Sequence, residues 1–527
     1  MDTNYTLQLL NEESAGCLLC ENAPCTTACP HQIAIHQILQ SLYFSNPAGA
    51  AQKLPDTDFC SSCTEKSCMA ACLKGRITRP VAIDQVLPAL ASLSYPPKPE
   101  NDPDLSIDFC DLHCENPFFL SSSVVGSNYE MISKAFDMGW AGVVYKTITS
   151  FAHEEVSPRF ATTPGTHHGF DGFKNLEESS EHTLEENITI MRRLKKDYPG
   201  KIVIASIMGQ NEDDWTFLAR ELTKAGIDAL ECNFSCPHMA YDGLGTDVGE
   251  DPALVDRYVR AIRRGSNLPL IAKMTANITS VVPPAIAAVN AGADALAAIN
   301  TIKSIVNVSG DTFSGEPCVS GKTAVGGYSG NAVHPIANRF VYDMAATPQL
   351  KNIPLSGTGG VENWQDALDF LLLGCTNIQI TTAIMQYGYR IIDDLLSGLK
   401  HYLKIHHISN VRDIVGKALP QVVGANALDR ETICYPKFNH KQCIGCGRCY
   451  ISCYDGGHQA LTLDENRTIR MNPKKCVGCH LCLKVCPTGA ITVGTRVLKK
   501  KKRKIEILLF TDPRKSLIIR TSGCNDV

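Results

Sequence analysis

The stretch I-P-L-S-G-T-G-G (353–360) joins a short apolar run to a glycine-rich turn, and a second apolar run, N-I-Q-I-T-T (377–382), follows it. The second run leads through Ala383 into a predicted helix. Backbone N–H groups of a glycine-rich turn and of a helix N-terminus bind phosphate groups. In (β/α)8 barrels these two features follow the seventh and eighth strands. The stretch therefore predicts the last two strands of an α/β barrel that binds a phosphorylated cofactor.

Six more apolar runs rich in β-branched residues precede these two, and helix-length amphipathic stretches such as 212–225 and 252–264 lie between runs. Such short runs predict buried strands. They are P-F-F-L (117–120), G-V-V-Y-K (142–146), I-V-I-A-S-I (202–207), A-L-E-C-N (229–233), L-I-A-K (270–273) and A-L-A-A-I-N (295–300). Eight strand–helix repeats predict a (β/α)8, or TIM, barrel. A doubly wound open sheet is the alternative, although it usually has fewer strands.

Polar side chains gather where the predicted strands end. Lys146 and Lys273 end two of the runs, N-F-S-C-P-H (233–238) follows a third, and Asn300 and Thr301 follow a fourth. Active sites of such barrels are built at the C-terminal ends of the strands. These positions are therefore candidates for binding and catalysis.

Eight cysteines near the C-terminus form two runs that both read C-x2-C-x2-C-x3-C, and the second run ends in Pro487. In two-cluster ferredoxins the fourth cysteine of each run ligates the other cluster. This rule predicts two [4Fe-4S] clusters, one on Cys443, Cys446, Cys449 and Cys486 and the other on Cys476, Cys479, Cys482 and Cys453. Zinc is the alternative metal for C-x2-C pairs, but two four-cysteine runs, of which the second ends in Cys-Pro, favour iron.

Eight further cysteines near the N-terminus form two runs that both read C-x2-C-x4-C-x3-C. The same crossing rule predicts one cluster on Cys17, Cys20, Cys25 and Cys72, and another on Cys29, Cys60, Cys63 and Cys68. The chain would then carry up to four clusters, two at each end. Such an arrangement moves electrons one at a time to or from chemistry in the middle.

Spacing and composition divide the chain of 527 residues into four parts. We expect a helical iron–sulfur domain at 1–100, the barrel at 105–430, a ferredoxin-like domain at 435–495 and a tail at 496–527, with the proline-rich stretch 95–103 as a linker. The formal charge of −4 gives no indication of nucleic-acid binding. The N-terminus lacks the features of a signal peptide, and no uninterrupted apolar run has the length of a membrane span. We expect a cytoplasmic protein, in which cysteines favour metal ligation over a disulfide framework.

The loop N-F-S-C-P-H (233–238) resembles the active-site loop of the dihydroorotate and dihydropyrimidine dehydrogenases, which hold FMN in a (β/α)8 barrel. Other segments are similar to the same family: A-K-M-T-A-N (272–277), A-I-N-T-I-K-S (298–304), G-G-Y-S-G-N-A-V-H-P-I-A (326–337) and G-C-G-R-C-Y-I-S-C-Y-D-G-G-H-Q-A (445–460). Residues of about 105–495 resemble the catalytic subunits of bacterial NAD-dependent dihydropyrimidine dehydrogenases. The N-terminal module is similar to that of the long eukaryotic enzymes and of the bacterial partner subunit.

The resemblance implies roles for residues at matching positions. Cys236 would donate a proton to C5 of a pyrimidine. The residues implied in binding the base or flanking the thiol are Asn175, Glu177, Asn233, Ser235, His238, Asn300 and Thr301. Those implied in contacting the flavin are Lys146, Thr147, Lys273, Gly330, Gly359, Gly360, Thr381 and Thr382. Residues 160–180 are interpreted as an irregular loop, in which a helix-start role for Asn175 is the alternative.

The N-terminal module departs from the long enzymes, in which a glutamine is one ligand of the second cluster. Here Cys60 completes an internal repeat, whereas Gln85 is out of register. We therefore favour Cys60 as the ligand.

The implied activity is reduction of the 5,6 double bond of uracil or thymine by an oligomeric enzyme. The long enzymes place an FAD domain and an NADPH domain between the N-terminal module and the barrel. Both are missing here, and no G-x-G-x-x-G after a strand replaces them. NADH would therefore act through a partner, an FAD/NAD-binding flavoprotein subunit, or a ferredoxin would be the donor. Dihydroorotate oxidation and a non-catalytic electron-transfer role are the alternative functions.

Overall fold

The computed structural model describes residues 3–93, 95, 102–151, 154–165, 169–235 and 245–499. Leu9–Val422 forms one compact unit, and the part from Val423 onward belongs to a second. Most of the linker expected at 95–103, and nearly all of the tail, lie outside the described residues. In the part of the chain that the structure describes, no helix is both long enough and apolar enough to cross a bilayer.

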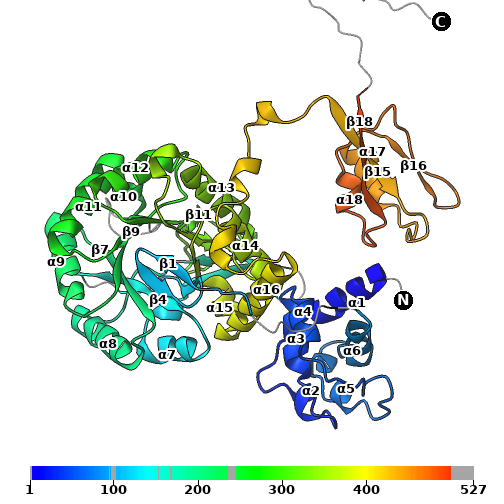
Figure 1. Cartoon of the computed structure of the whole chain (residues 1–527), viewed down its shortest axis with the longest axis horizontal. Helices are drawn as coiled ribbons and strands as arrows, with labels where there is room; N and C mark the ends of the chain where they lie inside the picture. The colour runs from blue at the N-terminus through cyan, green and yellow to red at the C-terminus, as the bar shows by residue number, and fades with distance from the viewer. Residues whose placement is uncertain are drawn as a thin grey trace, which may run out of the picture. The chain divides into compact units, whose positions relative to one another are not determined.

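Eight parallel strands close into a barrel ringed by helices (Figure 1). Neighbouring strands follow the order β10-β13-β14-β3-β4-β7-β8-β9. The strands are β3 (Phe118–Leu120), β4 (Gly142–Thr149), β7 (Ile202–Met208), β8 (Ala229–Asn233), β9 (Leu270–Lys273), β10 (Ala295–Ala298), β13 (Leu355–Thr358) and β14 (Asn377–Ile380). Each of the eight predicted runs forms one of these strands, so the (β/α)8 prediction is confirmed.

The barrel strands are apolar because helices cover their outer faces while side chains fill the interior. All seven residues of β7 are buried, for example. The helices that follow the strands are α7 (Tyr129–Asp137), α8 (Leu184–Asp197), α9 (Glu212–Thr223), α10 (Thr246–Gly249), α11 (Pro252–Gly265), α12 (Val282–Ala291), α13 (His334–Ala345), α14 (Trp364–Leu372), α15 (Thr382–Tyr387) and α16 (Ile392–Ile405). Capping boxes at Thr183 and Asn363 fix the starts of α8 and α14 by satisfying free backbone N–H groups.

Two insertions build a second sheet of four strands in the order β11-β12-β6-β5. The strands are β5 (Phe160–Pro164), β6 (Phe170–Asn175), β11 (Ile302–Ser304) and β12 (Gly326–Ser329). β6 follows barrel strand β4, whereas its antiparallel partner β12 follows β10, and Gly327 lies opposite Asn175. The expectation of an irregular loop at 160–180 is therefore wrong. Asn175 ends a strand and does not start a helix.

The N-terminal module is helical and rests on the barrel. Its helices are α1 (Thr3–Ala15), α2 (Pro24–Thr27), α3 (Ile35–Tyr43), α4 (Pro47–Ala51), α5 (Ser67–Ala70) and α6 (Ile83–Ala91). The carboxylate of Asp394 on α16 is 2% exposed and accepts hydrogen bonds from three side chains of the module. The donors are Gln40 Nε2 at 3.0 Å, Ser41 Oγ at 2.5 Å and Asn46 Nδ2 at 3.0 Å. Removing one partner of such a buried group is costly, so this contact holds the module in place.

The C-terminal unit pairs two long strands and a short hairpin around two helices. Its elements are β15 (Thr432–Phe438), α17 (Arg448–Gly456), β16 (Leu461–Leu463), β17 (Ile469–Met471), α18 (Leu481–Lys484) and β18 (Ile491–Leu498). β15 pairs with β18 and β16 with β17, both antiparallel. Cys449 and Cys482 belong to its small core, together with Leu461, Ile469 and Ile491. These two cysteines therefore belong to the hydrophobic core of the unit. A short antiparallel hairpin of β1 (Ile107–Phe109) and β2 (Leu112–Cys114) precedes the barrel.

Candidate active site and cysteine cages

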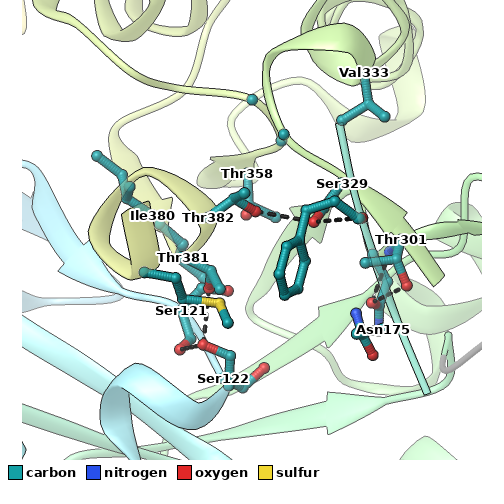
Figure 2. Close-up of a pocket in the computed structure, with 18 of the residues that line it drawn as sticks. Ser121, Ser122, Asn175, Thr301, Ser329, Val333, Thr358, Ile380, Thr381 and Thr382 are labelled. Atoms are coloured by element: carbon teal, nitrogen blue, oxygen red, sulfur yellow. Dashed lines mark hydrogen bonds between the residues drawn. The ribbon is translucent and has the colours of Figure 1, made fainter. Parts of the chain in front are cut away.

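A cavity opens at the C-terminal ends of the barrel strands. Residues in or directly after seven barrel strands, and residues of the second sheet, form its wall. Figure 2 shows Asn175 and Thr301 near each other on one side, and Ser121 and Ser122 on another. Clefts at this face of a (β/α)8 barrel are where such folds bind their cofactors and substrates.

Lys273 is buried beside this cavity in a polar network. Its Nζ lies 3.2 Å from Glu231 Oε1 and 3.0 Å from Gln379 Oε1, and it also contacts the hydroxyls of Ser121 and Ser122. Gln379 Nε2 in turn donates to Glu231 Oε2 at 2.8 Å. Glu231 and Gln379 are almost fully buried, and the sequence analysis missed both. The network holds the cation of Lys273 in one position and balances its charge.

Side-chain amides and hydroxyls form a second network on the cavity wall. Asn233 donates from Nδ2 to Thr147 Oγ1 at 3.0 Å, and Asn300 donates to Asn233 Oδ1 at 3.2 Å and to Ser235 Oγ at 3.0 Å. The backbone N–H of Thr301 donates to Asn300 Oδ1 at 2.7 Å. The structure thus brings together five residues that the sequence analysis named. Asparagine offers a donor and an acceptor in one plane, which suits recognition of a flat heterocycle.

Lys146, Asn175 and Glu177 line the same cavity. Lys146 Nζ lies 3.0 Å from Glu177 Oε2, and both side chains are largely buried. Arg159 Nη1 contacts the other oxygen of Glu177 at 3.1 Å. Glu177 therefore lies between two cations, which keeps its carboxylate fixed at the wall.

The predicted phosphate-binding turn is present as a close-packed cradle. Gly330, Gly359 and Gly360 have φ values of 95°, 131° and 73°, in the left-handed region that favours glycine. A Cβ on Gly360 would come within 2.7 Å of the Gly330 carbonyl oxygen. Thr381 and Thr382 begin helix α15 beside these glycines, and Ser329 Oγ lies 2.9 Å from Thr382 Oγ1. These glycines and threonines line the cavity with backbone, and such a cradle fits the phosphate of FMN.

Glu362 also lines the cavity, beside the glycine cradle. Burial, with smaller contributions from the neighbouring Asp366 and Asp171, raises the pKa of its carboxyl to about 7. The ordinary value is 4.5. Between these values the folded protein holds a proton that the unfolded chain releases. The free energy of unfolding therefore falls as the pH rises through this window.

We expect Glu362→Gln to flatten this pH dependence, because an amide replaces the protonated carboxyl without a charge to bury. Melting temperatures measured by calorimetry from about pH 5 to about pH 8 should fall less in the variant than in the unmodified protein. Exposed Glu130 offers a control, since Glu130→Gln should leave the profile unchanged. If the melting temperatures of Glu362→Gln and of the unmodified protein fell equally with pH, the raised pKa of Glu362 would be contradicted.

Cys236 and His238 lie outside the described residues, as does most of the loop that follows β8. The described chain reaches Ser235, which is buried at the end of β8 and hydrogen-bonded to Asn233. The loop is described again from Gly245.

The four cysteines predicted to share the first C-terminal cluster, Cys443, Cys446, Cys449 and Cys486, line one cavity. Burial raises the pKa of the Cys449 thiol, and the other three thiols raise it further. In the second predicted set, burial raises the pKa of Cys476, with further contributions from Cys479 and Cys453. Thiols gathered in this way fit iron, which would hold them as thiolates. Among the described residues, no group of three His, Cys, Asp or Glu is arranged to hold a single metal ion.

The N-terminal cysteines form two similar groups. Cys17, Cys20, Cys25 and Cys72 line one cavity, which we call the first N-terminal cage. Burial, with smaller contributions from Asp58, Cys29, Cys68 and Cys63, raises the pKa of Cys60 to about 11. The structure therefore brings Cys60 together with the three cysteines predicted to share its cluster.

The sequence matches models of known protein families over the barrel and both cysteine-rich ends. Residues 104–403 match the family model described as dihydroorotate dehydrogenase. The chain belongs to the family of dihydroorotate and dihydropyrimidine dehydrogenases. Residues 437–493 match a 4Fe-4S dicluster domain, and residues 1–91 match the model described as dihydropyrimidine dehydrogenase domain II, 4Fe-4S cluster. These matches support iron–sulfur clusters over zinc at both ends of this oxidoreductase.

Three relatives illustrate the range of the family. The NAD-dependent dihydropyrimidine dehydrogenase subunit PreA of Escherichia coli K12 is 53% identical over 407 residues, which cover 77% of this chain and 99% of the relative. The chloroplastic NADP(+) dihydropyrimidine dehydrogenase of Arabidopsis thaliana is 38% identical over 63% of this chain and 81% of the relative. The catalytic subunit of dihydroorotate dehydrogenase B (NAD(+)) from Pyrococcus horikoshii is 36% identical over 60% of this chain and 98% of the relative.

Proposed function

We propose that this chain is the catalytic subunit of a dihydropyrimidine dehydrogenase that reduces the 5,6 double bond of uracil or thymine. The observation that carries the proposal is the network of Asn233, Asn300 and Thr301, with Asn175 near Thr301, around one cavity. A pyrimidine base presents N–H donors and C=O acceptors in one plane, and amide side chains match such an edge. The names of the PreA and Arabidopsis relatives support the same substrate class.

The residues around the cavity have distinct proposed tasks. Asn175, Glu177, Asn233, Asn300 and Thr301 would bind the base, and Ser235 and His238 would flank the thiol of Cys236. Bound FMN would supply the hydride that reaches C6 of the base. Cys236 would give a proton to C5 from the opposite face, since a thiol on a loop is a suitable general acid.

The remaining residues would hold the flavin. Lys273 would stabilise negative charge at the N1/O2 edge, where its fixed position requires no rearrangement. Lys146 and Thr147 would contact the ring system. Gly330, Gly359, Gly360, Thr381 and Thr382 would bind the ring edge or the phosphate, mainly through backbone N–H groups.

Each of the three folded parts would hold some of the redox groups. Residues 1–100 and 435–495 would carry two [4Fe-4S] clusters each, and residues 105–430 would carry the flavin. Electrons would come from NADH through a flavoprotein partner, or from a ferredoxin. The reducing cytoplasm would suit the sixteen proposed ligand cysteines. We also propose an oligomeric enzyme, in line with the subunit names of its relatives.

Anaerobic photoreduction followed by addition of a pyrimidine tests the reaction. We expect uracil or thymine to reoxidise the flavin, with iron and sulfide contents that match four clusters. Reoxidation by orotate alone would instead favour the dihydroorotate dehydrogenase function. If no pyrimidine reoxidises the flavin, the result would favour a non-catalytic electron-transfer role.

The purified chain alone should not oxidise NADH at a useful rate, because the sequence has no recognisable dinucleotide site. The same preparation should turn over uracil with an artificial reductant such as a reduced viologen. Both rates are measured by anaerobic spectrophotometry on one sample, so that poor cluster loading affects them equally. Rapid NADH oxidation by the lone chain would contradict the need for a partner.

A further inference from the structure

Acidic residues adjoin the glycine cradle of the cavity. Glu362 closely follows Gly360 in the sequence and lines the same cavity. Asp171 adjoins the cradle as well, since its backbone oxygen would lie 2.9 Å from a Cβ at Gly330. Asp366 Oδ2 accepts a hydrogen bond from the backbone N–H of Glu362 at 2.9 Å. Three acidic residues therefore stand close to the place proposed for the phosphate of FMN.

The lysines of this cavity are already paired with carboxylates. Among the described residues that line it, the lysines are Lys146 and Lys273, and none is an arginine. His334 is a basic group at the cradle, but its Nδ1 lies 2.9 Å from the Gly359 carbonyl oxygen and its Nε2 lies 3.4 Å from Asp369 Oδ2. The described wall therefore offers no unpaired lysine or arginine to balance the charge of a phosphate in the cradle.

The charge of Glu362 depends on its surroundings. Burial, with smaller contributions from nearby carboxyl groups, raises the pKa of Glu362 to about 7, and a phosphate beside it would raise the pKa further because like charges repel. His334 acts in the opposite direction and lowers the pKa. The titratable groups that face Glu362 are Asp366 of α14, Asp171 of β6, His334 of α13, Tyr43 of α3 and Tyr387 of α15.

Glu362 also has a second side from which its proton can exchange. It lines a further, polar cavity together with Asn11 and Ser14 of the N-terminal module and Tyr387 at the end of α15. The module from Leu9 onward and the barrel form one compact unit, so the two cavities share this one carboxyl group. A proton can therefore reach Glu362 from the module side while a cofactor occupies the barrel side.

We infer that Glu362 is a cofactor-binding residue that acts as a neutral acid, so that FMN binds together with one proton. The inference rests on the proposed function, since that function places the phosphate of FMN in the cradle. A protonated carboxyl can donate a hydrogen bond to a phosphate oxygen, whereas an ionised carboxylate repels it. Riboflavin lacks the phosphate, so its binding has no such requirement.

The affinity for FMN should therefore change with pH in one direction. Below about pH 7 Glu362 already carries its proton, so this group adds no pH dependence there. Above about pH 7 the site must take up a proton to bind FMN. The affinity should then fall as the pH rises, by at most about tenfold per pH unit for one proton. The second ionisation of the phosphate itself, near about pH 6, lies below this window.

Dilution of the full-length holoprotein tests the inference. The fluorescence of released FMN gives its Kd at each pH from about 6 to about 9, and competition with riboflavin gives the Kd of the phosphate-free flavin. We expect the ratio of the Kd of FMN to that of riboflavin to rise above about pH 7 in the unmodified protein. The ratio should stay constant there in Glu362→Gln. Exposed Glu130 is the control, since Glu130→Gln should keep the rise.

The same measurements separate this inference from the proposed function. A ratio that is constant in the unmodified protein would overturn the inference without any variant, and so would an equal rise in Glu362→Gln. In both cases FMN still binds, and the proposed function stands. If orotate alone reoxidises the photoreduced flavin, the proposed substrate fails, whereas the ratio still tests Glu362. Protein that binds no FMN would overturn both.

Discussion

Replacing Cys236 by alanine should lower uracil reduction by about two to four orders of magnitude, the usual contribution of a positioned general acid. The flavin and iron contents should stay at the level of the unmodified protein, because neither the cradle nor a cage includes this residue. Turnover is measured with an artificial reductant, so that the electron donor does not limit the rate. Full activity of the variant would exclude Cys236 as the proton donor.

Two further variants sharpen this test. Cys318→Ala changes a cysteine that is exposed, and it should leave turnover unchanged. Cys236→Ser keeps a group that can carry a proton but is a much weaker acid than a thiol. Its activity should fall between those of the alanine variant and the unmodified protein, and the pH dependence of turnover should change with it.

Replacing Lys273 by methionine should destabilise the barrel by about 3–5 kcal/mol, the usual cost of removing one partner of a buried ion pair. The variant would leave Glu231, which is fully buried, without its cation. Urea unfolding followed by circular dichroism gives the free energy of unfolding. Exposed Lys303 is the control, since Lys303→Met should change that free energy by less than about 0.5 kcal/mol.

A second substitution distinguishes stability from function at this site. Glu231→Gln in the Lys273→Met background removes the unpaired charge, so most of the lost stability should return. Flavin reduction should stay impaired, because no cation is left at the proposed N1/O2 edge. Recovery of both properties in the double variant would show that Lys273 acts only through packing.

The barrel could be predicted because its strands are buried on both faces, so each reads as a continuous apolar run. Runs such as I-V-I-A-S-I (202–207) indicate a strand without knowledge of its neighbours. The second sheet could not be predicted in the same way. β6 depends on β12, which comes from a distant part of the chain, and its strand character arises mainly from that pairing.

Position along a strand also explains which site residues could be predicted from the sequence and which could not. Lys273 and Asn233 stand at strand ends, where function is expected in a barrel. Glu231 and Gln379 lie within strands, where an apolar residue is the rule. A charged or amide side chain in the middle of an otherwise apolar run was the available signal, because burial there requires a polar partner. Glu362 carries no comparable signal, because its environment comes from residues brought together only by folding.

The pairing of β6 with β12 constrains how the substrate range of this chain can change. The two strands come from separate insertions, yet a Cβ at Gly172 would overlap the Tyr328 hydroxyl, which also bonds to Thr163. If only one insertion were replaced by that of a relative, its strand would have side chains that pack against a different partner strand. Both insertions must be exchanged together for Asn175 to keep its place. We therefore expect that a change in the proposed substrate wall requires both segments, although some 150 residues separate them in the sequence.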